Sequence, residues 1–336
     1  MLKKPSLLDI RDLTRDYVSQ SLFGPAHRTR ALDAVSLTVE AGEIFGVVGE
    51  SGCGKSTLAR LAMALDRPTS GQVLFDGEDL FALSHKELMR RREHFQMVFQ
   101  DPYGSLDPRQ TIGRIVAEPL HVLAKRPGRA EIRDRVAAIL ESVGLKPEHI
   151  ERYPHEFSGG QRQRIAIARA LVTAPKLVIA DEPLSALDLS VQAQVLNLLM
   201  DLRDKRGVAF LFITHNLAVI DSIADRVGVM YRGRFVEIGP AHAVFERPLH
   251  PCTRALAEAE PSIAQFGRPD RPAERKIATP SEQGEGCPFR HRCPLAVARC
   301  ATEQPELRFV TAGRQAACHR AEEMAPKEDG GTDAGA

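Results

Sequence analysis

One short segment constrains the fold more than any other: a glycine-rich loop of the pattern Gly-x4-Gly-Lys-Ser, which runs from Gly49 to Ser56. An apolar stretch at 43–48 precedes it, and a stretch with helical spacing at 55–65 follows it. In this strand–loop–helix context backbone N–H groups can surround phosphate, because glycines leave no side chains in the way. The helix that starts near Lys55 would also point its N-terminal dipole at the phosphates. The segment therefore predicts a nucleotide site.

The residue types in the loop suggest individual roles. Lys55 is expected to reach the β- and γ-phosphates, and the Ser56 hydroxyl is expected to bind Mg²⁺. Cys53 is expected to be a small filler and not a nucleophile. The predicted nucleotide-binding residues of the loop are Gly49, Ser51, Gly52, Cys53, Gly54, Lys55, Ser56 and Thr57.

A second apolar stretch, at 177–180, ends in Asp181 and Glu182. In phosphoryl transfer a strand-end aspartate holds the Mg²⁺ shell, and another group orients the attacking water. Asp181 fits the first role, and Glu182 fits the second as a general base. For an isolated pair, two solvated acids at a turn would be the simpler explanation. The phosphate loop upstream favours the catalytic one.

A second glycine-rich segment, Phe157-Ser158-Gly159-Gly160-Gln161, begins a stretch with helical spacing. Ser158 is the expected N-cap, and the exposed helix start offers another anion site. The chain has one phosphate loop and one copy of this segment. We therefore expect each nucleotide site to be shared between two subunits.

The alternation of strand and helix along the chain predicts an α/β fold with a parallel sheet. Helical spacing over about 105–172 predicts a helical subdomain inserted between the two phosphate motifs. The expected strands are 7–13, 34–40, 43–48, 71–75, 177–180, 209–213, 227–231 and 234–238, and the expected helices are 55–65, 112–123, 129–143 and 161–172. The expected domains are an ATPase domain at 1–260, a linker at 261–286, a four-cysteine segment at 287–322 and a disordered tail at 323–336.

The composition bears on the binding partners and the cellular location of the chain. The 336-residue chain has a formal net charge of +1, which gives no reason to expect nucleic-acid binding. No apolar run approaches the roughly 18–20 residues needed to span a bilayer. The first residues lack the apolar core of a signal peptide. We therefore expect a cytoplasmic protein.

Taken together, these motifs resemble those of the ATP-binding subunits of ABC transporters, over about residues 5–260. The segment 157–161 looks like the ABC signature, although its first position is usually leucine. Gln100 matches the Q-loop glutamine, Asp188 matches the D-loop aspartate, and His215 matches the switch histidine. The expected fold is thus a P-loop ABC ATPase with an antiparallel β subdomain and an inserted helical subdomain.

The resemblance implies an active ATPase in which two subunits sandwich two ATP molecules head to tail. The implied catalytic residues are Glu182, His215 and Gln100. The implied Mg²⁺ ligands are Ser56, Gln100 and Asp181. The implied trans signature comprises Ser158, Gly159, Gly160 and Gln161. Tyr17 is the expected aromatic that stacks on adenine, with Phe23 as the alternative.

Longer stretches at 99–109, 153–164 and 250–256 are similar to the dipeptide/oligopeptide importer ATPases, most of all to the second ATPase subunit of the dipeptide system. This implies two permease subunits, a second homologous ATPase subunit and, indirectly, an extracellular solute-binding protein. It places the chain peripherally on the cytoplasmic face of the inner membrane. Nickel, glutathione or other small solutes stay open as cargo, and a homodimer stays open too. A soluble ABC protein acting on ribosomes or DNA, or an exporter subunit, is the less favoured alternative.

Four cysteines gather near the C-terminus: Cys287, Cys293, Cys300 and Cys318. Thiolates in fours favour zinc or an iron–sulfur cluster, but the short pairs typical of structural zinc sites are missing. The segment looks like the C-terminal extension of the peptide-importer ATPases, some of which carry a 4Fe–4S cluster. An iron–sulfur site is therefore the prediction, with zinc and metal-free thiols or disulfides as alternatives. The segment also has too little apolar content for a core of its own without such a staple.

Overall fold

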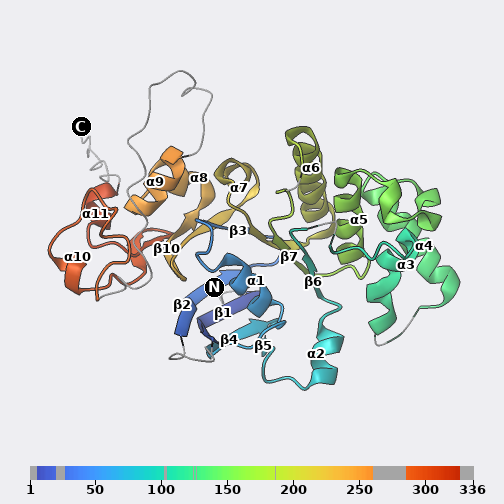
Figure 1. The fold of residues 1–336 in the computed structure, drawn as a ribbon, viewed down its shortest axis with the longest axis horizontal. Coiled ribbons are helices and arrows are strands. Elements are labelled where there is room, and N and C mark those ends of the chain that lie inside the picture. Colours follow the sequence, from blue (N-terminus) through green and yellow to red (C-terminus); the bar gives the residue numbers. More distant parts are fainter. Residues whose placement is uncertain are drawn as a thin grey trace, which may run out of the picture.

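The computed structural model describes residues 6–19, 27–101, 104–123, 125, 127–185, 187–259 and 285–325. These residues form two sheets, a block of helices at one end and a small C-terminal lobe at the other (Figure 1). Of the expected linker, residues 261–284 lie outside the described residues, and so do residues 326–336 of the expected tail. The tail prediction starts too early, because a short helix still covers Ala321–Met324.

The larger sheet has the strand order β11-β12-β10-β9-β3-β8-β7-β6. Its strands are β3 (Ile44–Gly49), β6 (Phe95–Val98), β7 (Leu177–Asp181), β8 (Ala209–Ile213), β9 (Arg226–Tyr231), β10 (Arg234–Pro240), β11 (Arg308–Thr311) and β12 (Arg314–Ala316). The adjacent strands in the part β9-β3-β8-β7-β6 pair in parallel, and those in the part β11-β12-β10-β9 pair antiparallel. Every residue of β3, β7 and β8 is buried, as expected for parallel strands covered on both faces.

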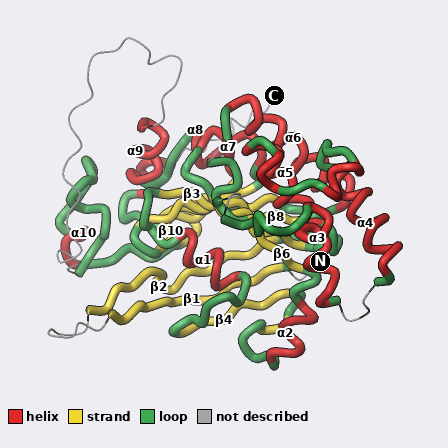
Figure 2. Tube along the Cα trace, turned by 45° about the vertical axis from the view of Figure 1, so that its right-hand side comes forward, coloured by secondary structure: helices red, strands yellow, loops and turns green. Residues whose placement is uncertain are grey.

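The smaller sheet is antiparallel and has the order β2-β1-β4-β5. Its strands are β1 (Leu8–Ser19), β2 (His27–Val39), β4 (Ser70–Phe75) and β5 (Glu78–Asp79). Helix α1 (Lys55–Ala62) contacts β2 of this sheet and β3, β7 and β8 of the larger one, so it lies between the two layers (Figure 2). The helix ends three residues earlier than expected, since Ala64 adopts a left-handed φ of 49° just after it.

Of the remaining helices, α2 packs on the side of the smaller sheet, α10 and α11 belong to the C-terminal lobe, and the others cover the other face of the large sheet or build the helical subdomain (Figure 1). They are α2 (His85–Arg91), α3 (Ile112–Ala117), α4 (Arg129–Ser142), α5 (Gly159–Leu171), α6 (Leu189–Arg206), α7 (Leu217–Ile223), α8 (Ala241–Glu246), α9 (Pro251–Ala259), α10 (Arg299–Thr302) and α11 (Ala321–Met324), with 3₁₀ turns η1 (Glu118–Val122), η2 (Pro147–Glu151) and η3 (Pro154–Glu156). The expected helix at 112–123 tightens into η1 because Pro119 has no N–H to continue the α-helical ladder. Among the described residues, no helix combines the length and the apolar character that crossing a bilayer requires.

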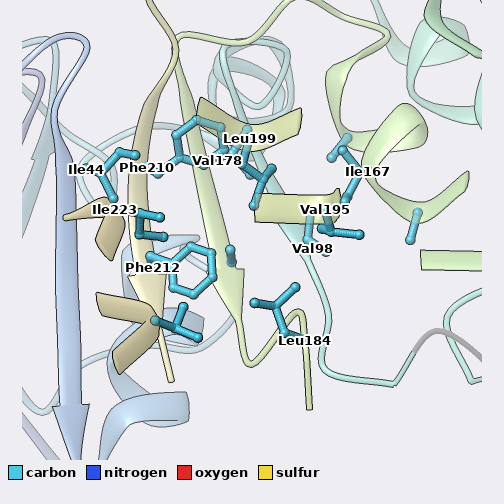
Figure 3. Packing of buried hydrophobic residues seen from close by; sticks show 14 of the residues in the cluster. Ile44, Val98, Ile167, Val178, Leu184, Val195, Leu199, Phe210, Phe212 and Ile223 are labelled. Atoms are coloured by element: carbon cyan, nitrogen blue, oxygen red, sulfur yellow. The ribbon is translucent and has the colours of Figure 1, made fainter. Parts of the chain in front are cut away.

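The two faces of the large sheet belong to two separate hydrophobic clusters. Alternate residues of β3 divide between them: Ile44 and Val48 face the helices, whereas Phe45 and Val47 face α1 and the smaller sheet. Figure 3 shows the first cluster, where Phe210 and Phe212 of β8 pack among aliphatic side chains from the helical side. This core fixes the ends of β3 and β7, the strands that carry the phosphate loop and the acidic pair.

The C-terminal lobe is joined to the ATPase domain through its backbone. Strand β12 pairs with β10, with Glu237 opposite Ala316, and β11 extends the same sheet. Phe289 is almost fully buried and meets the ring of Tyr231 edge-on at 5.3 Å. The lobe therefore does not depend on a core of its own, because Phe289, Cys287 and Cys300 join the core of the large sheet.

Candidate nucleotide-binding and hydrolysis site

The phosphate loop packs between the β9–β10 hairpin and β2, so closely that two of its positions have no room for a side chain. Gly49 has φ 155°, and a Cβ on it would lie 2.3 Å from the carbonyl oxygen of Met230. Gly54 has φ 111°, and a Cβ on it would lie 2.5 Å from the carbonyl oxygen of Ala31. Both contacts are with backbone, which cannot move aside cheaply. The pattern of glycines thus reports close backbone packing as well as room for a ligand.

Helix α1 begins at Lys55, directly after the loop, and no side chain caps it. Its first N–H groups are therefore free to face an anion. The Lys55 ammonium is buried and donates to the carbonyl oxygens of Gly49, at 2.7 Å, and Glu50, at 3.1 Å. Cys53 is buried inside the loop, and burial raises the pKa of its thiol. The neutral thiol is a poor nucleophile, in line with a filling role.

Two side chains whose oxygens could bind Mg²⁺, Ser56 and Asp181, lie beside each other at the loop. The Ser56 hydroxyl donates to Oδ1 of Asp181 at 3.4 Å, which joins the start of α1 to the end of β7. Burial raises the pKa of Asp181, and the neighbouring Glu182 raises it further. Ser56 and Gln100 line the same cleft, and Asp181 adjoins it through Ser56; the hydroxyl, the amide oxygen and the carboxylate are hard ligands of the kind Mg²⁺ prefers. The residues present fit the metal, which would neutralise charge on the β- and γ-phosphates.

Glu182 is the centre of the expected catalytic group. Its backbone adopts a left-handed φ of 46°, and its N–H donates to the Ile213 carbonyl oxygen at 2.9 Å. Its carboxylate accepts a hydrogen bond from Nε2 of Gln100 at 3.0 Å. Nδ1 of His215 lies 3.4 Å from the other carboxylate oxygen. The structure thus brings together three residues that are far apart in the sequence.

These groups line one cleft of about 580 Å³. Its lining comprises Ala31, Ser51, Gly52, Gly54, Lys55, Ser56, Thr57, Gln100, Glu182 and His215. All of these except Ala31 were expected from the sequence. Ala31 lies within β2 and carries no sequence signal. It lines the cleft because the backbone of this strand passes close to Gly54 of the loop.

Tyr17 lies outside this lining. Its hydroxyl donates to Asp66 at 3.1 Å, and the guanidinium carbon of Arg15 lies 4.6 Å from its ring centre. The ring is 38% exposed and so retains an accessible surface. Phe23, the alternative, lies outside the described residues.

The signature segment forms the predicted helix start, away from the phosphate loop of the same chain. Ser158 caps α5: its hydroxyl accepts from the Gln161 N–H at 3.4 Å, and the Gln161 side chain accepts from the Ser158 N–H at 3.1 Å. Gly160 packs so closely on Val191 that a Cβ would lie 2.4 Å from its Cγ1. Asp188 caps the neighbouring α6 by accepting from the Val191 N–H at 2.9 Å, which lowers the pKa of Asp188. The signature and the D-loop therefore form one packed corner.

The four C-terminal cysteines gather in the lobe, but not as a metal site. The Cys287 N–H donates to the Cys300 carbonyl oxygen at 2.8 Å, and each of Cys287 and Cys318 lies within electrostatic range of the other three. Burial raises the pKa of Cys318 to about 11 and raises that of Cys287 and Cys293. Throughout the described part of the chain, no three His, Cys, Asp or Glu side chains are grouped to hold a metal ion. The arrangement does not support the predicted 4Fe–4S ligand set.

The site combines a phosphate loop with an acidic pair at the end of β7, and Gln100 and His215 contact that pair. The signature helix lies apart from it. This combination defines the class of ABC-type ATPases. The family model described as ABC transporter matches residues 32–185. Among solved structures, the dimeric structure of the ATP-binding cassette MJ0796 bound to ADP and Pi is 29% identical, with a TM-score of 0.63, and the match covers 70% of this chain and 98% of that one. CbiO1 from Clostridium perfringens is 32% identical, with a TM-score of 0.62 and coverage of 72% and 92%.

A second family model, described as the oligopeptide/dipeptide transporter C-terminal region, matches residues 236–300. The di/tripeptide transport ATP-binding protein DppF of Pseudomonas aeruginosa is 51% identical over 323 residues, covering 95% of this chain and 99% of that protein. The dipeptide transport ATP-binding protein DppF of Haemophilus influenzae is 45% identical, with coverage of 93% and 96%. The chain belongs to the ATP-binding proteins of the dipeptide/oligopeptide ABC transporter family.

Proposed function

We propose that this chain hydrolyses ATP to energise a membrane importer of di- and oligopeptides. The observation that carries the ATPase part is the convergence of Gln100 and His215 on the carboxylate of Glu182, above the phosphate loop. The peptide part is supported by the relatives, which are named as di/tripeptide and dipeptide transport ATP-binding proteins. Nickel, glutathione or another small solute is the alternative cargo, because the ATPase does not touch what is transported.

We propose further that two ATPase subunits complete each site. The signature segment 157–161 is absent from the cleft that its own chain forms around the phosphate loop, so a partner is needed to bring such a segment to the γ-phosphate. Leu189, next to the D-loop corner, is 81% exposed, which suits a position that a partner covers. In the sandwich Ser158 and Gly160 would face the partner's nucleotide, and Asp188 would lie near the contact. The partner is a second homologous ATPase subunit, with a second copy of this chain as the alternative.

Two permease subunits and, through them, an extracellular solute-binding protein complete the proposed assembly. The chain would then be peripheral, on the cytoplasmic face of the inner membrane. Docking is proposed near residues 100–109, where the helical subdomain begins and next to which Phe99 is 42% exposed. Tyr17 is proposed to stack on adenine with its accessible ring face.

The iron–sulfur hypothesis for Cys287, Cys293, Cys300 and Cys318 is separate from the ATPase function. Their gathering in one lobe supports it, whereas their ligand geometry and raised pKa values do not. No step of ATP hydrolysis is assigned to a cluster. Anaerobic purification followed by iron and acid-labile sulfide assays tests it, and metal-free protein with an intact lobe would exclude it.

The decisive test of the proposed function is gentle purification of this chain from its native membranes. We expect two permease chains and a second ATPase to come with it, and ATP hydrolysis that Glu182→Gln abolishes. Transport of labelled dipeptides in reconstituted vesicles then tests the cargo. Ribosomal or DNA-repair components in place of permeases would refute the transporter while leaving the ATPase chemistry intact.

A further inference from the structure

An ion pair joins the C-terminal lobe to the phosphate loop. The guanidinium of Arg292 donates to both carboxylate oxygens of Glu50, with N···O distances of 2.7 and 2.9 Å. The two residues are 242 positions apart. Both side chains are largely shielded from solvent, at 26% and 32% exposed. Both contacts come from one nitrogen, Nη1 of Arg292, and a charge-assisted hydrogen bond of this kind is roughly twice as strong as one between neutral groups.

Arg292 is held ready for this contact by the lobe. Its backbone N–H closes a turn onto the Phe289 carbonyl oxygen at 3.0 Å, and its guanidinium carbon lies 5.3 Å from the centre of the Phe289 ring. Phe289 is itself clamped edge-on between Tyr231, at 5.3 Å, and His250, at 5.8 Å. The guanidinium is therefore fixed by the shared core of the lobe and the large sheet.

Glu50 is in the loop that surrounds the phosphates. Its carbonyl oxygen accepts from the Lys55 ammonium at 3.1 Å and from the Cys53 N–H at 3.3 Å, so its backbone is part of the phosphate cradle. Its carboxylate adds a negative charge to the loop that is proposed to hold the phosphates, next in sequence to Ser51 of the cleft lining. Without a partner that carboxylate would repel the nucleotide, most strongly at low ionic strength.

We propose that Arg292 is a positioning residue for ATP binding: it neutralises the Glu50 carboxylate and orients it away from the phosphates, so that the C-terminal lobe tunes nucleotide affinity. This inference rests on the proposed ATPase function. Its chemistry differs from a simple docking contact, since the two partners affect ATP in opposite directions. Loss of Arg292 leaves an adverse charge beside the nucleotide, whereas loss of the Glu50 charge removes it.

The test measures the KM for ATP hydrolysis and the Kd for MANT-ATP with the purified full-length chain. Arg292→Ala is expected to raise both by about three- to tenfold at low salt, with kcat little changed, and the effect should shrink in about 0.5 M KCl. Arg292→Lys, which keeps the charge, should restore most of the affinity. Glu50→Gln should bind ATP at least as tightly as the wild type, and the double variant should match Glu50→Gln.

Arg299→Ala is the matched control, because Arg299 lies in the same lobe and pairs only locally with Glu303 at 2.6 Å. It should leave KM and Kd unchanged. If Arg292→Ala and Glu50→Gln weaken ATP binding alike, the ion pair only docks the lobe and the proposal is wrong. An unchanged Kd in Arg292→Ala, with normal wild-type turnover, also overturns it. A wild-type chain that neither binds nor hydrolyses ATP would instead refute the proposed function, and this inference with it.

Discussion

The attachment of the C-terminal lobe should depend on one buried ion pair, between Arg314 of β12 and Glu237 of β10. The guanidinium donates to the carboxylate at 2.7 Å, and the two side chains are 8% and 0% exposed. Glu237 also accepts from the backbone N–H groups of Leu249 and His250, at 2.9 and 3.0 Å. Arg314→Met would keep much of the side-chain volume but leave the buried carboxylate without its cationic partner.

The size of the effect follows from what the carboxylate can do when its partner is lost. It escapes the uncompensated charge by taking up a proton, which at pH 7 costs about 1.4 kcal/mol for each unit between pH 7 and the ordinary glutamate pKa of 4.5, or about 3.5 kcal/mol. This agrees with the roughly 3–5 kcal/mol measured when one partner of a buried pair is removed. Because burial already raises the pKa of Glu237, the penalty should fall as the pH falls.

Hydrogen–deuterium exchange of the β12 amides reports this directly, since these amides exchange when the strand opens. Arg314→Met should speed their exchange by about 300-fold at pH 7 if the full penalty falls on local opening, and by only about tenfold at pH 5.5 relative to wild type at the same pH. Combining it with Glu237→Gln should recover most of the protection. A change below about fivefold at pH 7, or an effect independent of pH, would refute the reasoning.

Three further outcomes are expected. Glu182→Gln should keep ATP affinity but lower phosphate release by about 100-fold or more, as loss of a general base does, and near-normal turnover would remove Glu182 from the mechanism. Desolvation lowers the pKa of buried His250 from 6.5 to about 4, so the unfolded chain takes up the proton first as the pH falls. Between pH 7.5 and 5 the wild type should therefore lose about 2 kcal/mol more stability than His250→Gln, measured by urea unfolding. Equal losses in the two proteins would contradict the assignment. Gly160→Ala should destabilise the chain by about 1–3 kcal/mol through its clash with Val191, measured by thermal unfolding. The double variant Gly160→Ala, Val191→Ala should lose less stability than the sum of the losses in the two single variants, and additive losses would contradict the clash.

The parts of the fold that the sequence predicts are those whose signal is local. The apolar run before Gly49 and the Ser158 cap needed only neighbouring residues, and both are present as expected. Strand β6 (Phe95–Val98) was not predicted because four residues carry too little pattern. The grouping of cysteines was visible in the sequence, but whether thiols meet at ligand distances depends on tertiary placement.

The proximity of Gln100, Glu182 and His215 was predictable for a different reason: each ends or follows a recognisable strand or loop, so resemblance to family motifs singled them out. What the motifs do not contain is the balance of charge around them. Glu182 lines the cleft, Asp181 accepts a hydrogen bond from Ser56 of its lining, and Glu50 belongs to the phosphate loop, so three acidic residues belong to a site proposed to accept a polyanion. The ammonium of Lys55 is bonded to loop carbonyl oxygens. Bound Mg²⁺ would compensate Asp181 and Glu182 at the end of β7, whereas Glu50 lies in the phosphate loop. Its compensating cation comes from Arg292, in a lobe that has no local sequence relation to the loop. A lobe that shares the sheet through β12 holds that cation in a fixed place, so the extension contributes a contact to the phosphate loop as well as strands to the sheet.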